Sequence, residues 1–366
     1  MLETLYTANK FFRKNRPLDE SSTSCTVFRQ GGLLEIAVPS VRCRHDLAGG
    51  CMMCNYGIGK PLRSLELIKT QFYKHLEEIG EDLETLILCT NGSFFDESSL
   101  TREVQTAILD IAQASVAKTI IIETHVDTLS KDLLKRVRKI LFNKDVILEL
   151  GLESSDMFVQ EYCYLKKINL DFLSEIISYG QNLELKFQLN IMLGAPFLSE
   201  GERLHDTKQS ISWALNHGAM VVLFPMNIKP FTLLHFAYEN GLYADISHWL
   251  MPIILNCFSA EELENIDIAW YGNREIKYPD ASTIFPSDCD ICHEKLQSFY
   301  DNYAVSHDGN ERKKMVREVL KIGMKECDCL NKELKKVQVC NEFQKTNVMT
   351  QIEELIERLK NKQIIR

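Results

Sequence analysis

The chain has 366 residues, of which 45% are hydrophobic and 25% charged; these proportions suit a soluble globular protein and exclude a disordered or collagen-like one. Its longest apolar run, residues 219–226, is far shorter than the ~20 residues of a membrane helix, and residues 1–4 lack the apolar segment of a signal peptide, so we expect no membrane partner. Lys and Arg number 42 against 51 Asp and Glu, and this acidic balance argues against a broad, non-specific nucleic-acid binder.

Short apolar runs and amphipathic helical patterns alternate along the first 230 residues. The runs with strand character are 33–39, 85–89, 119–123, 146–153, 183–193 and 220–226. Helical spacing lies between them, at 62–79, 99–114, 129–141, 170–179 and 202–215. A repeated strand–helix order predicts a parallel sheet. Six such units predict an α/β fold, a partial (βα)6 TIM-type barrel rather than the full eight units.

The remaining chain predicts a mostly helical extension. We divide the sequence into an N-terminal extension (1–30), the barrel (31–230), a cysteine-containing C-terminal extension (231–330) and a basic helical tail (331–366). Residues 311–366 hold fourteen basic and nine acidic residues, a bias that suits either a solvated helix or an RNA backbone. One helical stripe in the tail is apolar and predicts docking on the chain itself or on a partner: Val348, Ile352, Leu355, Ile356 and Leu359.

The strand patterns predict which side chains point into the barrel. In 183–193 every second residue is apolar and must pack on the helices, so Lys186, Gln188 and Asn190 should face the lumen. The same alternation directs further carboxylates inward: Glu123, Glu149 and Glu153. Unless a strand is shifted in register, a lumen with so many polar groups requires a polar ligand.

The twelve cysteines form two groups and a scattered remainder. Without a signal peptide they indicate a reducing, cytoplasmic compartment rather than a disulfide scaffold. Five scattered cysteines are interpreted as small buried residues: Cys25, Cys89, Cys163, Cys257 and Cys340. The N-terminal group consists of Cys43, Cys51 and Cys54, and the C-terminal group of Cys289, Cys292, Cys327 and Cys329.

The N-terminal group has the spacing Cys-x7-Cys-x2-Cys and follows the first predicted strand. Ligands bind at the C-terminal ends of strands in such folds. Three thiolates can hold three irons of a [4Fe–4S] cluster, and the fourth iron then stays open for a ligand. Zinc would require a fourth protein ligand, for which His45 is a candidate. The spacing alone also leaves a metal-free loop open.

An open-site cluster on a partial barrel resembles the radical S-adenosylmethionine (SAM) superfamily. The first gap is four residues longer than the usual Cys-x3-Cys-x2-Cys, as also occurs in the branch of the Elongator catalytic subunit. The sequence is more similar to the radical SAM subunits of archaeosine synthase (RaSEA). Shared segments are the x7 gap, 53–56, 92–96, 151–154, 225–227 and the C-terminal cysteines. The resemblance covers most of residues 30–330.

This resemblance implies how the cofactor is bound. SAM would bind the open iron, and one electron, from a donor such as ferredoxin or flavodoxin, would cleave it to methionine and a 5′-deoxyadenosyl radical that abstracts a substrate hydrogen. Gly92 and Ser93 would lie near the SAM amino group, and Glu153 and Ser154 near its ribose or carboxylate. Met53 and Tyr56 would pack beside the cluster and adenine. Glu123 and His125 stand where the Elongator branch has Glu-x-Arg. Read as residues alone, 92–93 is also a turn and 153–154 also a helix cap.

The C-terminal cysteines have Cys-x2-Cys and Cys-x-Cys spacing, 34 residues apart. Such a set can close a tetrahedral S4 site for structural zinc, and RaSEA-like proteins have a similar set. Four thiolates also hold a second iron–sulfur cluster. The spacing does not choose between zinc, a cluster and no metal.

Three functions are consistent with these features. In the first, as in archaeosine synthase, a partner enzyme attaches lysine to a deazaguanine base in tRNA, and this protein breaks a carbon–nitrogen bond of that lysine. In the second, a radical SAM enzyme acts on a small amino-acid-derived metabolite or peptide, which suits the acidic barrel. In the third, the protein is a non-catalytic, metal-stabilised RNA-binding or scaffold protein.

Overall fold

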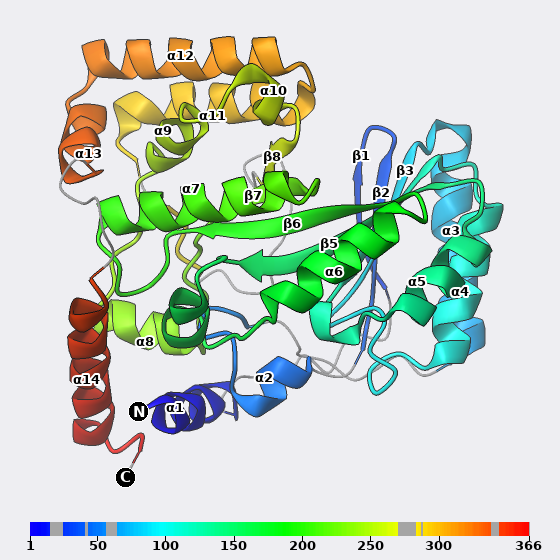
Figure 1. The fold of residues 1–366 in the computed structure, drawn as a ribbon, viewed down its shortest axis with the longest axis horizontal. Helices are drawn as coiled ribbons and strands as arrows, with labels where there is room; N and C mark the ends of the chain where they lie inside the picture. Colours follow the sequence, from blue (N-terminus) through cyan, green and yellow to red (C-terminus); the bar gives the residue numbers. More distant parts are fainter. Residues whose placement is uncertain are drawn as a thin grey trace.

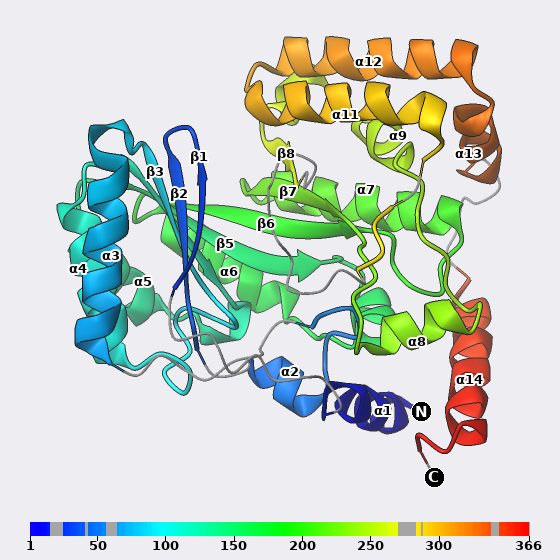
Figure 2. The same ribbon diagram turned by 180° about the vertical axis from the view of Figure 1, so that it is seen from behind.

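The computed structural model describes residues 1–14, 25–40, 43–55, 64–269, 283–286, 288–337 and 344–365. One curled sheet runs through the molecule in the order β1 to β8, and helices lie along its outer side (Figures 1 and 2). The strands are β1 (Thr26–Gln30), β2 (Leu33–Val38), β3 (Thr85–Thr90), β4 (Thr119–Thr124), β5 (Asp145–Glu153), β6 (Leu185–Leu193), β7 (Met220–Pro225) and β8 (Ile266–Ile268). β1 is antiparallel to β2, and every other neighbouring pair is parallel.

Each central strand is followed by a helix, which confirms the predicted partial barrel. The helices of these units are α3 (Leu65–Ile79), α4 (Arg102–Ala114), α5 (Lys131–Ile140), α6 (Leu170–Gln181) and α7 (Glu200–Asn216). All five begin with a Ser, Thr or Asn whose side chain accepts a backbone N–H of the first turn, the interaction that favours a helix start at those positions.

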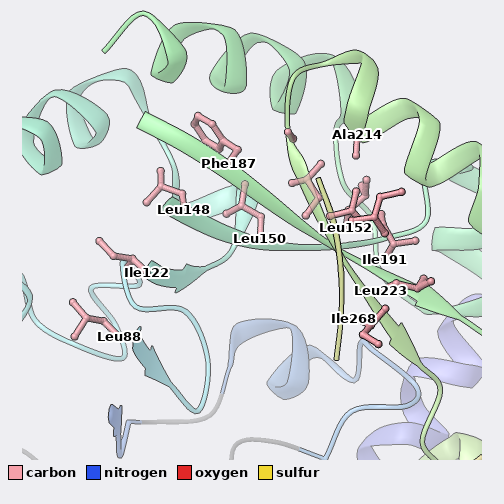
Figure 3. Packing of buried hydrophobic residues seen from close by; sticks show 14 of the residues in the cluster. Leu88, Ile122, Leu148, Leu150, Leu152, Phe187, Ile191, Ala214, Leu223 and Ile268 are labelled. Atoms are coloured by element: carbon pink, nitrogen blue, oxygen red, sulfur yellow. The ribbon is translucent and has the colours of Figure 1, made fainter. Parts of the chain in front are cut away.

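The outer side chains of the strands make the core. Leu88, Ile122, Leu148, Leu150 and Phe187 are fully buried or nearly so and pack toward the helices (Figure 3). The alternate residues face the lumen, as the sequence predicted for β4, β5 and β6. Burial of the outer face fixes the register, because a shift by one residue would exchange the two faces.

The structure differs from the sequence prediction at the sheet edges. β1 and β8 were not predicted, because β1 is five residues with little buried surface and β8 only three. β6 begins at Leu185 and not at Leu183, since Glu184 has a φ of 59°, which is incompatible with an extended strand.

A second apolar cluster lies beneath the C-terminal edge of the sheet. It includes residues of α1 (Leu2–Lys14), α8 (Leu233–Glu239) and α14 (Lys345–Asn361). Val348, Ile352, Leu355 and Leu359 of α14 are fully buried there, so the apolar stripe of the tail docks on its own chain.

The C-terminal extension packs on α7, on the opposite side of the molecule from α1 (Figures 1 and 2). It consists of α9 (Leu250–Leu255), α10 (Ala260–Leu263), α11 (Asp290–Val305), α12 (Gly309–Glu326) and α13 (Cys329–Val337). No helix in the described ranges has the length and apolar character required to cross a bilayer.

Candidate functional site

The three N-terminal cysteines lie in one folded loop just beyond the end of β2. Cys43 precedes the short helix α2 (Arg44–Ala48), and Cys51 and Cys54 follow it. The Cys51 N–H donates to the Leu165 carbonyl at 3.0 Å, and Cys54 N–H donates back to the Cys51 carbonyl at 2.9 Å. Cys51 has a φ of 54°, an uncommon conformation for a residue with a side chain, found mainly where surrounding contacts determine it. The loop therefore has a defined conformation that its contacts determine.

Helix α1 holds this loop from below. The Arg13 guanidinium donates to the carbonyls of Gly50 (2.7 Å), Cys51 (2.6 Å) and Cys54 (2.9 Å) and forms an ion pair with Asp46 of α2 in which both side chains are buried. Asn9 donates to the Gly49 carbonyl at 3.0 Å. Arg13 thus contacts both α2, through Asp46, and the 50–54 segment, and it fixes these two parts of the cysteine loop relative to each other.

Sequence reasoning missed this role of α1, because residues 1–30 contain no metal-ligating motif. Gly49 was the one available signal. It has a φ of 87°, and a Cβ on it would lie 2.3 Å from the Tyr6 carbonyl oxygen. Only glycine, which has no Cβ, lets the α1 backbone approach the loop this closely, so a glycine at this position indicates that another segment packs against it.

The surroundings of the thiols fit a bound metal cluster. Burial raises the pKa of Cys51 to about 12 and that of Cys43 to about 11, so thiolates here require compensating positive charge. The charge of Cys54 raises the pKa of both other thiols further, although the three sulfur atoms are not within 4.8 Å of one another as those of the C-terminal group are. His45, the candidate fourth ligand of a zinc ion, instead lies 3.5 Å from Asp127 and stacks on His125. His45, His125 and Asp127 have their ligand atoms within 4.8 Å of one another, beside three cysteines whose number suits an open-site iron–sulfur cluster.

The turn after β3 braces the loop from the side. A Cβ at Gly92 would lie 3.2 Å from Cys43 Cα, so glycine permits the close approach of the two segments. Ser93 is buried, with its Oγ 2.6 Å from Thr124 Oγ1, and it accepts the His125 N–H at 3.0 Å. His125 Nε2 in turn lies 3.6 Å from Cys43 Sγ. These contacts give Ser93 a structural role in placing His125.

On the radical SAM function proposed below, we expect Gly92→Ala to weaken the site slightly and Gly92→Val to reduce SAM cleavage about tenfold to a hundredfold, the effect of an ångström-scale misplacement. The added methyl groups would push against the Cys43 backbone. Iron content and 5′-deoxyadenosine formation measured for both variants test this. Wild-type values for Gly92→Val would show that the contact is not needed.

A buried ion pair lies on the other side of the thiols. Lys166 Nζ donates to Glu153 Oε1 at 2.8 Å and to the Gly151 carbonyl at 2.6 Å. Burial opposes the charge of Lys166, but the Glu153 carboxylate and the Cys51 thiol outweigh it, and the pKa of Lys166 is raised. Glu153 ends β5 with a φ of 66°. The ammonium group is thus a fixed positive charge beside the cysteine loop, whereas Lys167 is exposed and lies 3.8 Å from Glu161.

The lumen, on the inner face of the curled sheet, is acidic. Glu123 of β4 and Glu149 of β5 are adjacent in register, and Gln188 of β6 continues the row. Asn190 Nδ2 donates to Glu149 Oε1 at 3.0 Å. Burial, and then the charge of Glu149, raises the pKa of Glu123 to about 8. The lumen therefore favours either protons or a cationic group.

This raised pKa predicts a pH-dependent stability. The unfolded chain ionises Glu123 near its usual pKa, about 4.3, and the folded chain ionises it near 8, so its protonated form favours folding and the advantage is lost as the pH rises between these values. We expect Glu123→Gln to raise the melting temperature by several degrees at pH 9 and to have little effect at pH 4.5. Thermal melts across this range measure it; an equal shift at both values would contradict the assignment.

The other predicted residues are placed differently. Lys186 faces inward by alternation but lies near the start of β6, is exposed, and forms an ion pair with Asp145 at 2.8 Å, so it does not join the residues around the loop. Ser154 is fully buried and donates to Asp206 Oδ1 of α7 at 2.6 Å, a structural bond. Met53 is buried in the apolar cluster beneath the loop. Tyr56 lies outside the described residues.

The four C-terminal cysteines form a separate group. Their Sγ atoms all lie within 4.8 Å of one another. Both ribbon views place α11 and α13, which contain or adjoin these cysteines, far from α2 (Figures 1 and 2). They are therefore not part of the loop beneath the sheet.

Two curated proteins are similar in sequence, while no family model matches the chain. Archaeosine synthase subunit beta of Methanosarcina acetivorans is 26% identical over 225 residues, which cover 60% of this chain and 64% of that protein. An uncharacterised protein of Methanocaldococcus jannaschii is 23% identical over 237 residues, or 62% of this chain and 65% of that protein. The chain thus matches just under two thirds of the length of each relative.

Solved structures of radical SAM enzymes are similar in fold. The methyltransferase TsrM from Kitasatospora setae gives a TM-score of 0.48 at 6% identity, over 80% of this chain and 61% of its own. Elp3 of Methanocaldococcus infernus gives 0.44 at 16% identity, over 66% and 57%. Similarities of this size say nothing of substrate or reaction. The partial barrel is established by the sheet itself, and the predicted resemblance to archaeosine synthase is confirmed by the similarity to its subunit beta.

Proposed function

We propose that this protein is a radical SAM enzyme. The supporting observation is the buried three-cysteine loop, held by Arg13 at the C-terminal edge of a sheet whose inner face is polar. Cys43, Cys51 and Cys54 would hold a [4Fe–4S] cluster with one open iron. When bound, the cluster and SAM supply a 5′-deoxyadenosyl radical, which removes a hydrogen atom from the substrate.

The chain's own residues orient the cofactors and balance their charge. Lys166 places one positive charge beside the thiolates, which offsets their negative charge in the buried loop. His125 contacts Cys43 at 3.6 Å; burial lowers its pKa to about 3, so it is a neutral donor or acceptor at physiological pH. Gly92 follows β3, Glu153 ends β5, and Asn190 lies three residues before the end of β6; we propose that SAM binds beside these residues.

The acidic lumen supports a substrate with a cationic group. Glu123 and Glu149 are half-buried and paired across neighbouring strands, and an ammonium or amidinium group entering there would relieve their repulsion. A lysine attached to a nucleobase has such a group. We therefore propose a reaction like that of archaeosine synthase, in which a carbon–nitrogen bond of a lysine-modified deazaguanine in tRNA is broken after a partner enzyme has attached the lysine.

The extension supplies a basic surface that suits the tRNA backbone. One face of α12 presents Lys314, Arg317 and Lys321, with Glu318 among them, while the neighbouring Lys313 ammonium donates to the carbonyls of Asn256 (2.8 Å) and Phe258 (2.6 Å). Lysine and arginine rows of this kind bind phosphates by counterion release. The acidic body, in contrast, favours the second candidate, a small amino-acid-derived substrate. In either case we propose a cytoplasmic enzyme that receives its electron from a ferredoxin or flavodoxin.

Parallel incubations with different substrates distinguish the tRNA substrate from the small-molecule substrate. The reduced, cluster-loaded protein is incubated with SAM and either lysine-modified tRNA, the same tRNA without lysine, or free lysine. Mass spectrometry of the nucleosides is expected to show loss of the lysine carbon skeleton only in the first. Consumption of free lysine with intact tRNA would instead establish the small-molecule reading.

A further inference from the structure

The four C-terminal cysteines converge from two segments of the chain. Cys289 precedes α11, Cys292 lies in its first turn, Cys327 follows α12, and Cys329 begins α13. Cys289 Sγ lies 3.4 Å from both Cys292 Sγ and Cys327 Sγ, and Cys327 Sγ lies 3.1 Å from Cys329 Sγ. All four thiols are free, and these separations exceed the ~2.05 Å of a disulfide bond.

Such a cluster of sulfur atoms requires a shared partner. Thiols are weak hydrogen-bond donors and acceptors, so hydrogen bonding alone gives little reason for four of them to meet. With a Zn–S bond of about 2.3 Å, a tetrahedral ion holds its four sulfurs about 3.8 Å apart. All six sulfur–sulfur distances in the structure are at most 4.8 Å, which is compatible with this tetrahedral spacing. The thiolates of a four-iron cluster each bind a different iron and stand farther apart.

The site is supported by a rigid shell. Cys292 is 2% exposed, and Trp249 beside it is 1% exposed. A Cβ at Gly323 of α12 would lie 2.3 Å from the Trp249 ring, so that helix packs directly on the indole. Side chains packed directly behind metal ligands hold those ligands in place. The ligands therefore do not depend on one flexible loop.

We propose that Cys289, Cys292, Cys327 and Cys329 bind a single zinc ion, and not a second iron–sulfur cluster, and that this ion fixes the helices of the extension relative to one another. The ion joins the start of α11 to the junction of α12 and α13. α13 packs against α7, and Asp206 of α7 accepts the hydrogen bond from Ser154, the residue after Glu153. The zinc site thus supports the helix that backs the C-terminal end of β5.

The test is metal analysis of the full-length, cluster-loaded protein and its variants. We expect about one zinc in addition to about four irons per chain. Cys327→Ser and Cys329→Ser should each lower the zinc content roughly fivefold or more and leave iron and acid-labile sulfide unchanged. Cys54→Ala should do the reverse. Cys257 belongs to neither group and is exposed, so its predicted burial was wrong; Cys257→Ser is the matched control and should change neither metal.

X-ray absorption at the zinc edge of the wild-type protein does not depend on the folding of a variant. Four sulfur neighbours at about 2.3 Å are expected. Nitrogen or oxygen neighbours, an iron content near eight with matching sulfide, or disulfides among these four cysteines under anaerobic, reducing purification would each overturn the proposal. Because Cys54→Ala should retain zinc, failure of the zinc site and failure of the radical chemistry are separate outcomes.

Discussion

Replacement of Cys51 by alanine is expected to remove the proposed iron–sulfur cluster and to lower SAM cleavage more than about a hundredfold. Only two thiolates would then remain to hold the cluster. Cys51 is buried within the loop, its N–H bonds to Leu165, and its carbonyl accepts from Arg13, so no neighbouring cysteine can take its place without refolding the loop. The same loss is expected for Cys43→Ala and Cys54→Ala. Iron, acid-labile sulfide and the visible absorbance of the anaerobically reconstituted protein measure it.

Cys163→Ala is the matched control. Cys163 is fully buried in the same apolar cluster as Cys51, and its loss should cost only the packing of one small side chain. Equal loss of iron in Cys163→Ala and Cys51→Ala would show that the effect arises from disturbed packing and not from a missing ligand.

Arg13→Met is expected to lower stability by about 3–5 kcal/mol, the cost of leaving a buried charge without its partner, and to prevent stable cluster binding. Three carbonyls of the cysteine loop lose their donor, and Asp46 keeps its charge in a site where both side chains are buried. Denaturant unfolding of the anaerobic protein measures the stability, and iron content measures the cluster.

The double variant Arg13→Met/Asp46→Asn separates the two effects. Removing the orphaned charge should restore part of the stability, while the carbonyls remain without a donor and iron content stays low. If the single variant kept full iron content, the role of α1 in holding the cysteine loop would be refuted.

Much of the fold could be predicted from the sequence because buried strands and helices have different periods. The alternation in β6 identified the face of Gln188 and Asn190, since apolar side chains must meet the helices. The alternation did not show how far along the strand, and so how close to the cysteine loop, each inward-facing residue lies. Lys186 shares the inner face, yet it lies near the start of β6 and pairs with Asp145 in solvent, away from the ends of the strands that surround the cysteine loop.

The site could be predicted only where its chemistry leaves a local pattern. Cysteines spaced one to seven residues apart leave a local pattern, so both cysteine groups could be recognised, the C-terminal one as two short pairs 34 residues apart. The groups that brace the loop come from distant segments: Arg13 from the first helix and Lys166 from the turn after β5. Arginine and lysine are common surface residues, and only the tertiary structure shows that these two are buried. Ser93 and Ser154 illustrate the converse, since both lie in motif segments but bond to Thr124 and Asp206.

The most direct test of the central claim is the formation of 5′-deoxyadenosine. The anaerobically reconstituted protein is reduced with dithionite, supplied with SAM and lysine-modified tRNA, and assayed by mass spectrometry beside Cys54→Ala. We predict 5′-deoxyadenosine and methionine in equal amounts from the wild type and none above background from the variant. A wild-type protein that holds iron and sulfide but forms no 5′-deoxyadenosine with this substrate or with free amino acids, or a variant that matches the wild type, would contradict the account.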